Sequence, residues 1–199
     1  MMSLERFDTG SPAETSNLAR LARETPERCM KVSLLDLPIV WTQDNRGELP
    51  PLSDETRDRL EERNWPEPVL EAIGSEAEAQ IYENADLEPD KVNNKDALIR
   101  TDIAYDQEDD LGRTNLERMQ LGLAPLDADG NKVELHHIGQ QADSPLAELT
   151  RAEHRGKGND NVLHNKLKES EINREDFDKE RKEYWKARAE EIEQQRTEG

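Results

Sequence analysis

All four histidines of the 199-residue chain lie between positions 136 and 164. Two of them form the doublet His136-His137, and the others are His154 and His164. Imidazole is the side chain best suited to binding a transition metal and to moving protons near neutral pH. The clustering therefore favours a metal or proton-transfer site. A doublet that is exposed at a strand end by chance is the alternative that these residues alone leave open.

The residues around the histidines predict the order strand, loop, strand, helix. The turn signal Asp129-Gly130 precedes the strand that carries the doublet, and a polar loop over 139–145 leads to a second strand at 146–149. Thr150 and Glu153 have the spacing of a capping box, in which hydroxyl and carboxylate each satisfy a free backbone amide. We therefore expect His154 to lie about one turn inside a helix.

The doublet can serve one site only under a geometric condition. Neighbouring side chains of a regular strand point to opposite faces, so the strand must end or kink near His136 and His137. Gly139 follows closely and makes such a break reasonable. A doublet at a strand end would let one imidazole hold a metal while its neighbour reaches a nearby water.

The rest of the chain divides into two predicted parts. Residues 1–52 are rich in Ser, Thr, Glu, Arg and Pro and read as a loosely ordered segment with one apolar patch at 32–41. Residues 53–199 read as the folded domain. Within it, local signals predict helices from Ser53, Pro66, Ser75 and Thr114, a turn at 93–96, a strand at 97–103, and a last helix from about Asn173. The last helix is sparsely apolar, which predicts a solvated helix packed along one edge or a partner-binding arm.

Composition limits the classes of function. The formal net charge is −19, which repels nucleic acid and membranes at long range. Between Lys132 and Lys168, however, the chain has six Lys and Arg and five Asp and Glu, so the histidine region does not share the negative charge of the whole chain. The single Cys29 excludes an internal disulfide framework. Without a signal-like start or a long apolar run, we expect a soluble chain with no membrane contact, acting in a cytoplasm or delivered there by export without a cleaved signal.

The motifs around the histidines resemble the LHH branch of the HNH/endonuclease VII nucleases. The resemblance rests on Leu135-His136-His137, on Leu149-Thr150 followed by His154, and on His164. It covers about residues 55 to 190 and extends over 112–119, Gly122, Ala124-Pro125, Asp129-Gly130, 134–140, 143–150 and 154–159. It implies a mostly helical α+β fold with a small ββα-metal, treble-clef-like core. It also implies a metal-dependent endonuclease, commonly the toxin end of a bacterial polymorphic toxin that an immunity protein neutralises.

The resemblance also implies roles for individual residues. His136 would be a metal ligand and His137 the general base, while His154 would be a ligand or phosphate contact and His164 the remaining ligand. The cofactor would be one divalent ion, Mg, Mn, Zn or Ni, and the substrate nucleic acid, with DNA favoured over RNA. The residues that we expect to contact this substrate are Arg155, Lys157, Arg113 and Asn115. For Arg155 and Lys157 the alternative is that they lie on a solvated face without contacting substrate. For Arg113 and Asn115 the alternative is that they belong to a helix start that only packs.

Two departures from the family pattern remain. A glycine-rich break at 156–158 separates His154 from His164, so this loop must fold back if both are ligands. The asparagine that commonly orients the base has no counterpart, since the corresponding stretch reads Ser144-Pro145, and Gln140, Gln141 or a backbone carbonyl could replace it. A non-catalytic histidine-metal module that binds nucleic acid or protein is the alternative function. A third is an interaction protein with incidental histidines.

Overall fold

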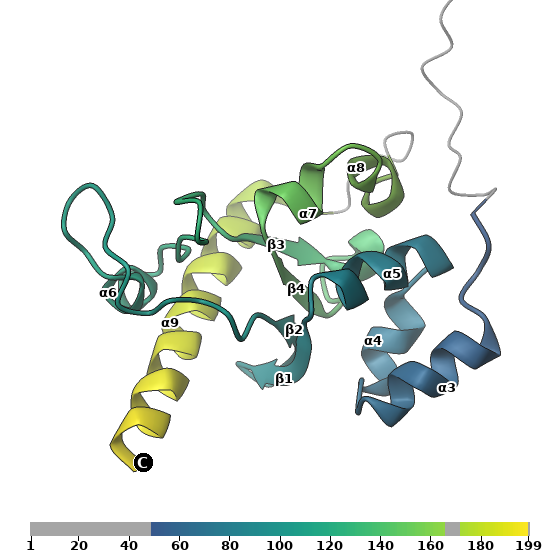
Figure 1. Ribbon diagram of the computed structural model, residues 1–199, viewed down its shortest axis with the longest axis horizontal. Coiled ribbons are helices and arrows are strands. Elements are labelled where there is room, and N and C mark those ends of the chain that lie inside the picture. Colours follow the sequence, from purple (N-terminus) through teal and green to yellow (C-terminus); the bar gives the residue numbers. More distant parts are fainter. Residues whose placement is uncertain (1–48, 166–171, 199) are drawn as a thin grey trace, which may run out of the picture. The chain divides into compact units, whose positions relative to one another are not determined.

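A mixed sheet of short strands lies between two groups of helices in the computed structural model (Figure 1). The structure describes residues 49–165 and 172–198, all within the compact unit Asp44–Gly199. Cys29, the apolar patch at 32–41 and most of the 1–52 segment lie outside the described residues. The elements are α3 (Asp54–Glu62), α4 (Glu67–Ala72), α5 (Glu76–Asn84), β1 (Glu88–Val92), β2 (Lys95–Ile99), α6 (Asn115–Gln120), β3 (Glu134–His137), a 3-10 turn (Ile138–Gln140), β4 (Leu146–Leu149), α7 (Arg151–Arg155), α8 (Asn159–Leu163) and α9 (Arg174–Glu198). The expected α+β class, mostly helical with a small ββα core, is confirmed.

The strand order is β1-β2-β4-β3, which leaves β3 at one edge of the sheet. Strands β1 and β2 form an antiparallel hairpin, β2 and β4 run parallel, and β3 and β4 are antiparallel. Asn93 and Asn94 make the hairpin turn with φ values of 52° and 61°, which asparagine tolerates better than most residues. The sequence did not predict β1, and the strand expected at 97–103 instead spans Lys95–Ile99.

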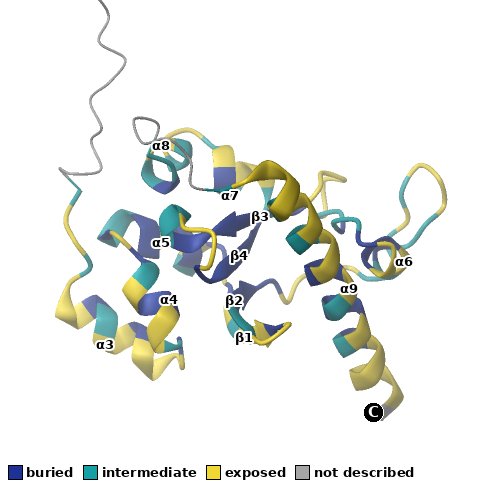
Figure 2. Ribbon diagram, turned by 180° about the vertical axis from the view of Figure 1, so that it is seen from behind, coloured by how far each residue is buried: buried dark blue, intermediate teal, exposed yellow. Residues whose placement is uncertain are grey.

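Alternation along the strands sends buried side chains to two separate clusters. Leu98, Ala147 and Leu149 pack with α3, α4, α5 and α8 on one face. Their neighbours Ala97 and Leu146 pack with α6 and α9 on the other face. In Figure 2, β2, β3 and β4 are largely buried, whereas most of β1 is exposed. The sheet is covered on both faces at β2 and β4, which explains why 97–99 and 146–149 are buried throughout.

Local capping fixes where the short helices begin. Ser53, Ser75, Thr114 and Thr150 are N-caps, as the sequence predicts, and each accepts a bond from a backbone amide of the first turn. Thr114 and Thr150 complete full capping boxes. Ser75 and Glu78 have the spacing of a third box, which is only half formed because the Glu78 carboxylate accepts from the Gly74 amide and the Tyr82 hydroxyl.

Helix α9 packs across a face of the sheet rather than along its edge. Its residues Tyr184, Trp185 and Ile192 are buried in the second cluster. Tyr184 donates to Oε1 of Glu148 at 2.8 Å, and Arg188 donates to the same oxygen at 3.0 Å. The helix is therefore packed against the rest of the fold, and its role as a partner-binding arm stays a prediction. Within the described part of the chain, every helix is too short or too polar to cross a membrane.

Candidate active site

Strands β3 and β4 and helix α7 form the ββα unit that carries the histidines. The pairing of His136 with Ala147 and His137 with Leu146 fixes the register of the doublet. The capping box at Thr150 starts α7, which places His154 one turn later against the sheet. Strand β3 ends at His137, and Gly139 follows with a φ of 75°, so the expected break after the doublet is present.

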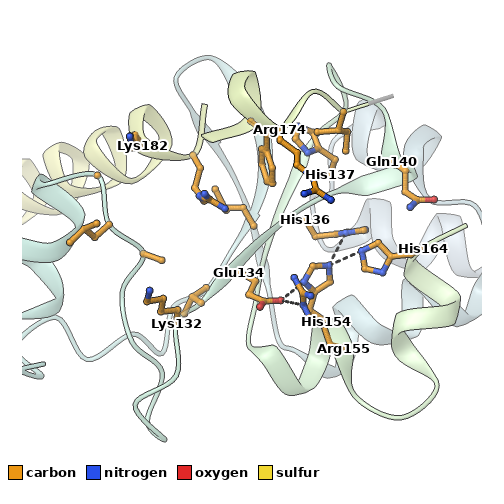
Figure 3. Close-up of a pocket in the computed structure, with 18 of the residues that line it drawn as sticks. Lys132, Glu134, His136, His137, Gln140, His154, Arg155, His164, Arg174 and Lys182 are labelled. Carbon is orange, nitrogen blue, oxygen red and sulfur yellow. Dashed lines mark hydrogen bonds and ion pairs between the residues drawn. The ribbon is translucent and has the colours of Figure 1, made fainter. Parts of the chain in front are cut away.

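Three histidines from three elements meet beside this unit (Figure 3). Nε2 of His154 lies 3.2 Å from Nδ1 of His136 and 3.1 Å from Nε2 of His164. The chain brings His164 back by ending α7 sharply at Gly156, where a Cβ would lie only 2.2 Å from the Ala152 carbonyl oxygen. His164 then follows the last residue of α8. The fold-back that the glycine-rich break required is therefore present.

The outer nitrogens of two of these rings fix their tautomers. Nδ1 of His154 lies 2.6 Å from the Glu134 carboxylate, and Nδ1 of His164 lies 3.1 Å from the backbone oxygen of Asp160. An ionised carboxylate and a carbonyl only accept hydrogen bonds, so each Nδ1 must carry the proton. In the neutral rings both Nε2 atoms are then lone pairs, and they face each other at 3.1 Å. Such a contact is repulsive unless a positive charge lies between the two nitrogens.

The protonation of the surrounding groups favours a metal ion as that charge. Burial lowers the pKa of His154 by more than its hydrogen bond to Glu134 raises it, so a proton is disfavoured there. Burial alone would raise the pKa of Glu134, but hydrogen bonds from Arg155 and His154 outweigh it and hold this pKa below its usual value. The carboxylate therefore stays ionised beside the ring. A carboxylate behind a neutral imidazole is the usual support of a histidine that binds metal.

The spacing of the three nitrogens fits one transition-metal ion. At metal–nitrogen distances of about 2.0–2.1 Å, the two pairs that His154 forms with His136 and with His164 would each subtend about 100° at the ion, near the tetrahedral angle. All three ligand atoms lie within 4.8 Å of one another. Three protein ligands also leave a coordination position for water or substrate, as in catalytic zinc sites. An all-imidazole set suits Zn, Ni and similar ions better than Mg, which prefers oxygen ligands.

His137 points to the opposite face of β3 and contacts α9. Its Nε2 lies 2.9 Å from Oε2 of Glu180, and its ring centroid lies 4.7 Å from that of Phe177. Its Nδ1 is buried and has no hydrogen-bond partner among the described residues. Because β3 is an edge strand, a cavity of about 690 Å³ wraps around it and is lined by His137 as well as by the three clustered histidines.

Sequence reasoning missed Glu180. Besides His137 it holds Lys95, whose Nζ lies 2.6 Å from Oε1. Burial would raise the pKa of Glu180, but hydrogen bonds from His137 and Lys95 outweigh it and lower this pKa. Of the groups expected to orient the base, Gln140 instead accepts from the Asn165 amide. The spacing of Phe177, Glu180 and Tyr184 along one helical face was the available signal, because it places the carboxylate on the buried side.

Basic side chains surround the cavity. Among the residues that the structure describes, its lining includes one carboxylate, Glu134, and the cations Arg118, Lys132, Arg155, Arg174, Arg181 and Lys182. Three of the cations form ion pairs, with Asp109, Glu134 and Asp178. Lys132, Arg174 and Lys182 form no ion pair with any residue that the structure describes, and Figure 3 shows them spread around the cavity. In a chain of net charge −19 this is a local reversal of sign.

The four residues expected to bind substrate do not come together. Arg155 lines the cavity, where it donates to Glu134 at 2.7 Å. Lys157 is exposed in the turn between α7 and α8, and Arg113 is bound to Asp109. Asn115 is fully buried, and its amide bonds the backbones of Ala104 and Leu126. Among the four, Arg155 is thus the one that the structure brings to the cavity.

Comparison with known protein families gives one match for this region. Residues 114–191 match the LHH family, described as a nuclease of the HNH/ENDO VII superfamily with conserved LHH. The matched segment contains all four histidines and Glu180. No solved structure matches the chain.

Proposed function

Because residues 114–191 belong to the LHH family of HNH/ENDO VII nucleases, we propose that this chain is a metal-dependent endonuclease. In this proposal His136, His154 and His164 hold one divalent ion, and His137 is the general base. The observation that carries it is the 3.1 Å contact between Nε2 of His154 and Nε2 of His164, two rings whose Nδ1 atoms both face hydrogen-bond acceptors. Neutral imidazoles brought together in this way are arranged for a cation.

The ligand count separates a catalytic site from a structural one. A structural zinc site closes its coordination with four protein ligands, whereas three ligands beside a large cavity leave room for a reacting group. The cluster of three imidazoles at the cavity wall therefore supports catalysis over the alternative of a non-catalytic metal module. The presence of a further imidazole beside a ligand, with one ring nitrogen unpartnered among the described residues, supports the same choice.

The residues then have the following roles in phosphodiester hydrolysis. When bound, the ion supplies Lewis acidity toward the phosphate oxygens. Nδ1 of His137 accepts a proton from the attacking water as the water oxygen bonds to phosphorus. The bond from phosphorus to the 3′ oxygen breaks, and that oxygen takes a proton from solvent. Glu134 and Asp160 keep His154 and His164 in the tautomer whose Nε2 faces the cluster.

The charge around the cavity supports nucleic acid as the substrate, and we propose DNA in preference to RNA. Lys132, Arg174 and Lys182 are exposed cations at the cavity. They would meet the phosphate backbone locally, while the net charge of the chain opposes binding at a distance. Binding should therefore weaken steeply as salt rises. Arg155 remains a proposed phosphate contact next to the ligand cluster.

We extend the proposal to the whole of residues 53–199, because α3, α4 and α5 share a buried cluster with the ββα unit. The family resemblance of the sequence further suggests a bacterial toxin with an immunity protein as its partner. Growth arrest on expression in a bacterial host, absent for His137→Ala, is the result expected of such a toxin. If the unaltered chain cuts DNA in vitro but its expression leaves growth normal, this role is contradicted.

The direct test is cleavage of supercoiled plasmid and of single-stranded RNA by the metal-free full chain after adding Mn²⁺, Ni²⁺, Zn²⁺ or Mg²⁺. We expect plasmid cleavage with one of the first three ions and less with Mg²⁺. His154→Ala should lose both metal binding and cleavage, whereas His137→Ala should lose cleavage alone. Lys186→Gln, an exposed change on α9, is the matched control. Metal binding without cleavage of either substrate would favour the non-catalytic module instead.

A further inference from the structure

We infer that Glu180, held by Lys95, is the positioning residue for His137: it fixes this ring in the tautomer whose Nδ1 can accept a proton. The inference rests on the proposed function and adds a residue and an element to it. Glu180 lies on α9, outside the ββα unit that carries the histidines. Strands β2 and β3 and helix α9 would then all contribute to the state of one imidazole.

The tautomer follows from the chemistry of the contact. Oε2 of Glu180 lies 2.9 Å from Nε2 of His137. An ionised carboxylate has no proton to donate, so Nε2 must be the donor and must carry the ring proton. In the neutral ring Nδ1 is then a lone pair, and this is the nitrogen without a hydrogen-bond partner among the described residues. The contact therefore selects which nitrogen is available as a base.

The surrounding side chains fix the orientation of the His137 ring and of the Glu180 carboxylate. The His137 side chain is 1% exposed and packs against the Phe177 ring. Lys95 donates to Oε1 of Glu180 at 2.6 Å and to the backbone oxygen of Ala142 at 3.2 Å. Each carboxylate oxygen of Glu180 thus has its own donor, and the lysine that holds one of them is itself tied to the loop before β4.

The lysine makes the substitution Glu180→Gln informative, since the new amide has the same shape but only one acceptor oxygen. Lys95 can only donate, so the amide oxygen should turn to it and leave the amide NH₂ facing Nε2 of His137. Nε2 would then have to accept, which moves the ring proton to Nδ1 and removes the base. Replacing Lys95 by methionine as well frees the amide to turn its oxygen back to His137.

The experiment compares the full chain with Glu180→Gln, Lys95→Met and the double variant. Glu183→Gln is the matched control, because it removes an exposed carboxylate from the same helix and changes the net charge equally. Ring ¹⁵N NMR spectra, with and without Zn²⁺, report the tautomer of His137, whose signals are identified by their loss in His137→Ala. Plasmid cleavage gives kcat and KM for each protein.

We expect an Nε2–H tautomer in the unaltered chain and an Nδ1–H tautomer in Glu180→Gln. The kcat of Glu180→Gln should fall about 10²- to 10⁴-fold, because this is the usual contribution of a general base. KM should stay within about twofold, since no substrate contact is lost. Glu183→Gln should match the unaltered chain, and the double variant should regain both the Nε2–H tautomer and part of the lost kcat.

Two results would overturn the inference. One is an Nδ1–H tautomer in the unaltered chain, which needs no variant to fold and no activity to be measured. The other is a Glu180→Gln protein that cuts as fast as the unaltered chain. A chain that cuts no nucleic acid with any ion would instead overturn the proposed function, and the NMR result would still decide whether Glu180 sets the tautomer.

Discussion

Replacing Arg188 by methionine should destabilise the protein strongly, because it leaves a buried carboxylate without its counter-charge. Arg188 donates to Glu148 at 3.0 Å, and the two side chains are 4% and 0% exposed. Burial alone would lower the pKa of Arg188, but the attraction of Glu148 outweighs it and the pKa is raised. Methionine keeps the apolar stem but removes the charge. Glu148 would retain only its bonds from the Tyr184 hydroxyl and the Arg100 amide.

The expected loss is about 3–5 kcal/mol in the free energy of unfolding, the cost of breaking a buried ion pair from one side. That is a large share of the roughly 5–15 kcal/mol of an ordinary domain. Arg181→Met is the control, because its partner Asp178 and Arg181 itself are largely exposed. It should cost less than about 1 kcal/mol.

Urea unfolding followed by circular dichroism measures these losses. The double variant Glu148→Gln with Arg188→Met removes both charges and should recover about 2 kcal/mol relative to Arg188→Met alone, since no bare charge stays buried. The reasoning is refuted if Arg188→Met costs no more than Arg181→Met, or if the double variant is as unstable as the sum of the single variants. The result bears on function because α9 carries Glu180 to the site.

Three further predictions concern binding and stability. Lys182→Gln should weaken DNA binding and reduce the slope of log K against log salt by about 1. Lys186→Gln on the same helix should change neither quantity. If Lys182→Gln and the unaltered chain have the same slope, Lys182 does not contact the substrate. Asn115→Ala should cost about 1–3 kcal/mol of unfolding free energy with kcat/KM unchanged, and a selective loss of DNA binding would restore its predicted substrate role. The hydrogen bond from the Arg113 guanidinium holds the pKa of Asp109 below its usual value. The ionised Asp109 therefore stabilises the fold at neutral pH, and this stabilisation is lost when acid protonates the carboxylate. Asp109→Asn should unfold more easily than the unaltered chain at pH 7, and the two should be equally stable once Asp109 is protonated.

The parts of the fold that the sequence predicted depend on local chemistry. The caps at Thr114 and Thr150 and the turn at Asp129-Gly130 each act over a few residues, so they could be read directly. Strand β1 could not, because its sequence Glu-Pro-Asp-Lys-Val has one buried residue, Val92, and forms through its pairing with β2. Such an edge strand has no apolar pattern of its own.

The candidate site likewise contains residues that the sequence predicted and residues that it could not. Histidine content and spacing indicated a shared site, and the structure brings His136, His154 and His164 together. Glu180 lies 43 residues from His137 and is one of many acidic residues of α9, so only the packing of that helix against β3 distinguishes it. Asn115 shows the opposite case. The sequence offered both a substrate contact and a helix start that only packs, and the structure buries its amide among backbone groups.

The central claim is that three neutral imidazoles hold one divalent ion. The most direct measurement is the metal content of the full chain and of His154→Ala after loading with Zn²⁺ and removal of unbound ion. We expect one ion per chain for the unaltered protein and a large loss for His154→Ala with the fold retained. An unaltered chain that retains no ion, or a His154→Ala variant that retains as much as the unaltered chain, would contradict the account.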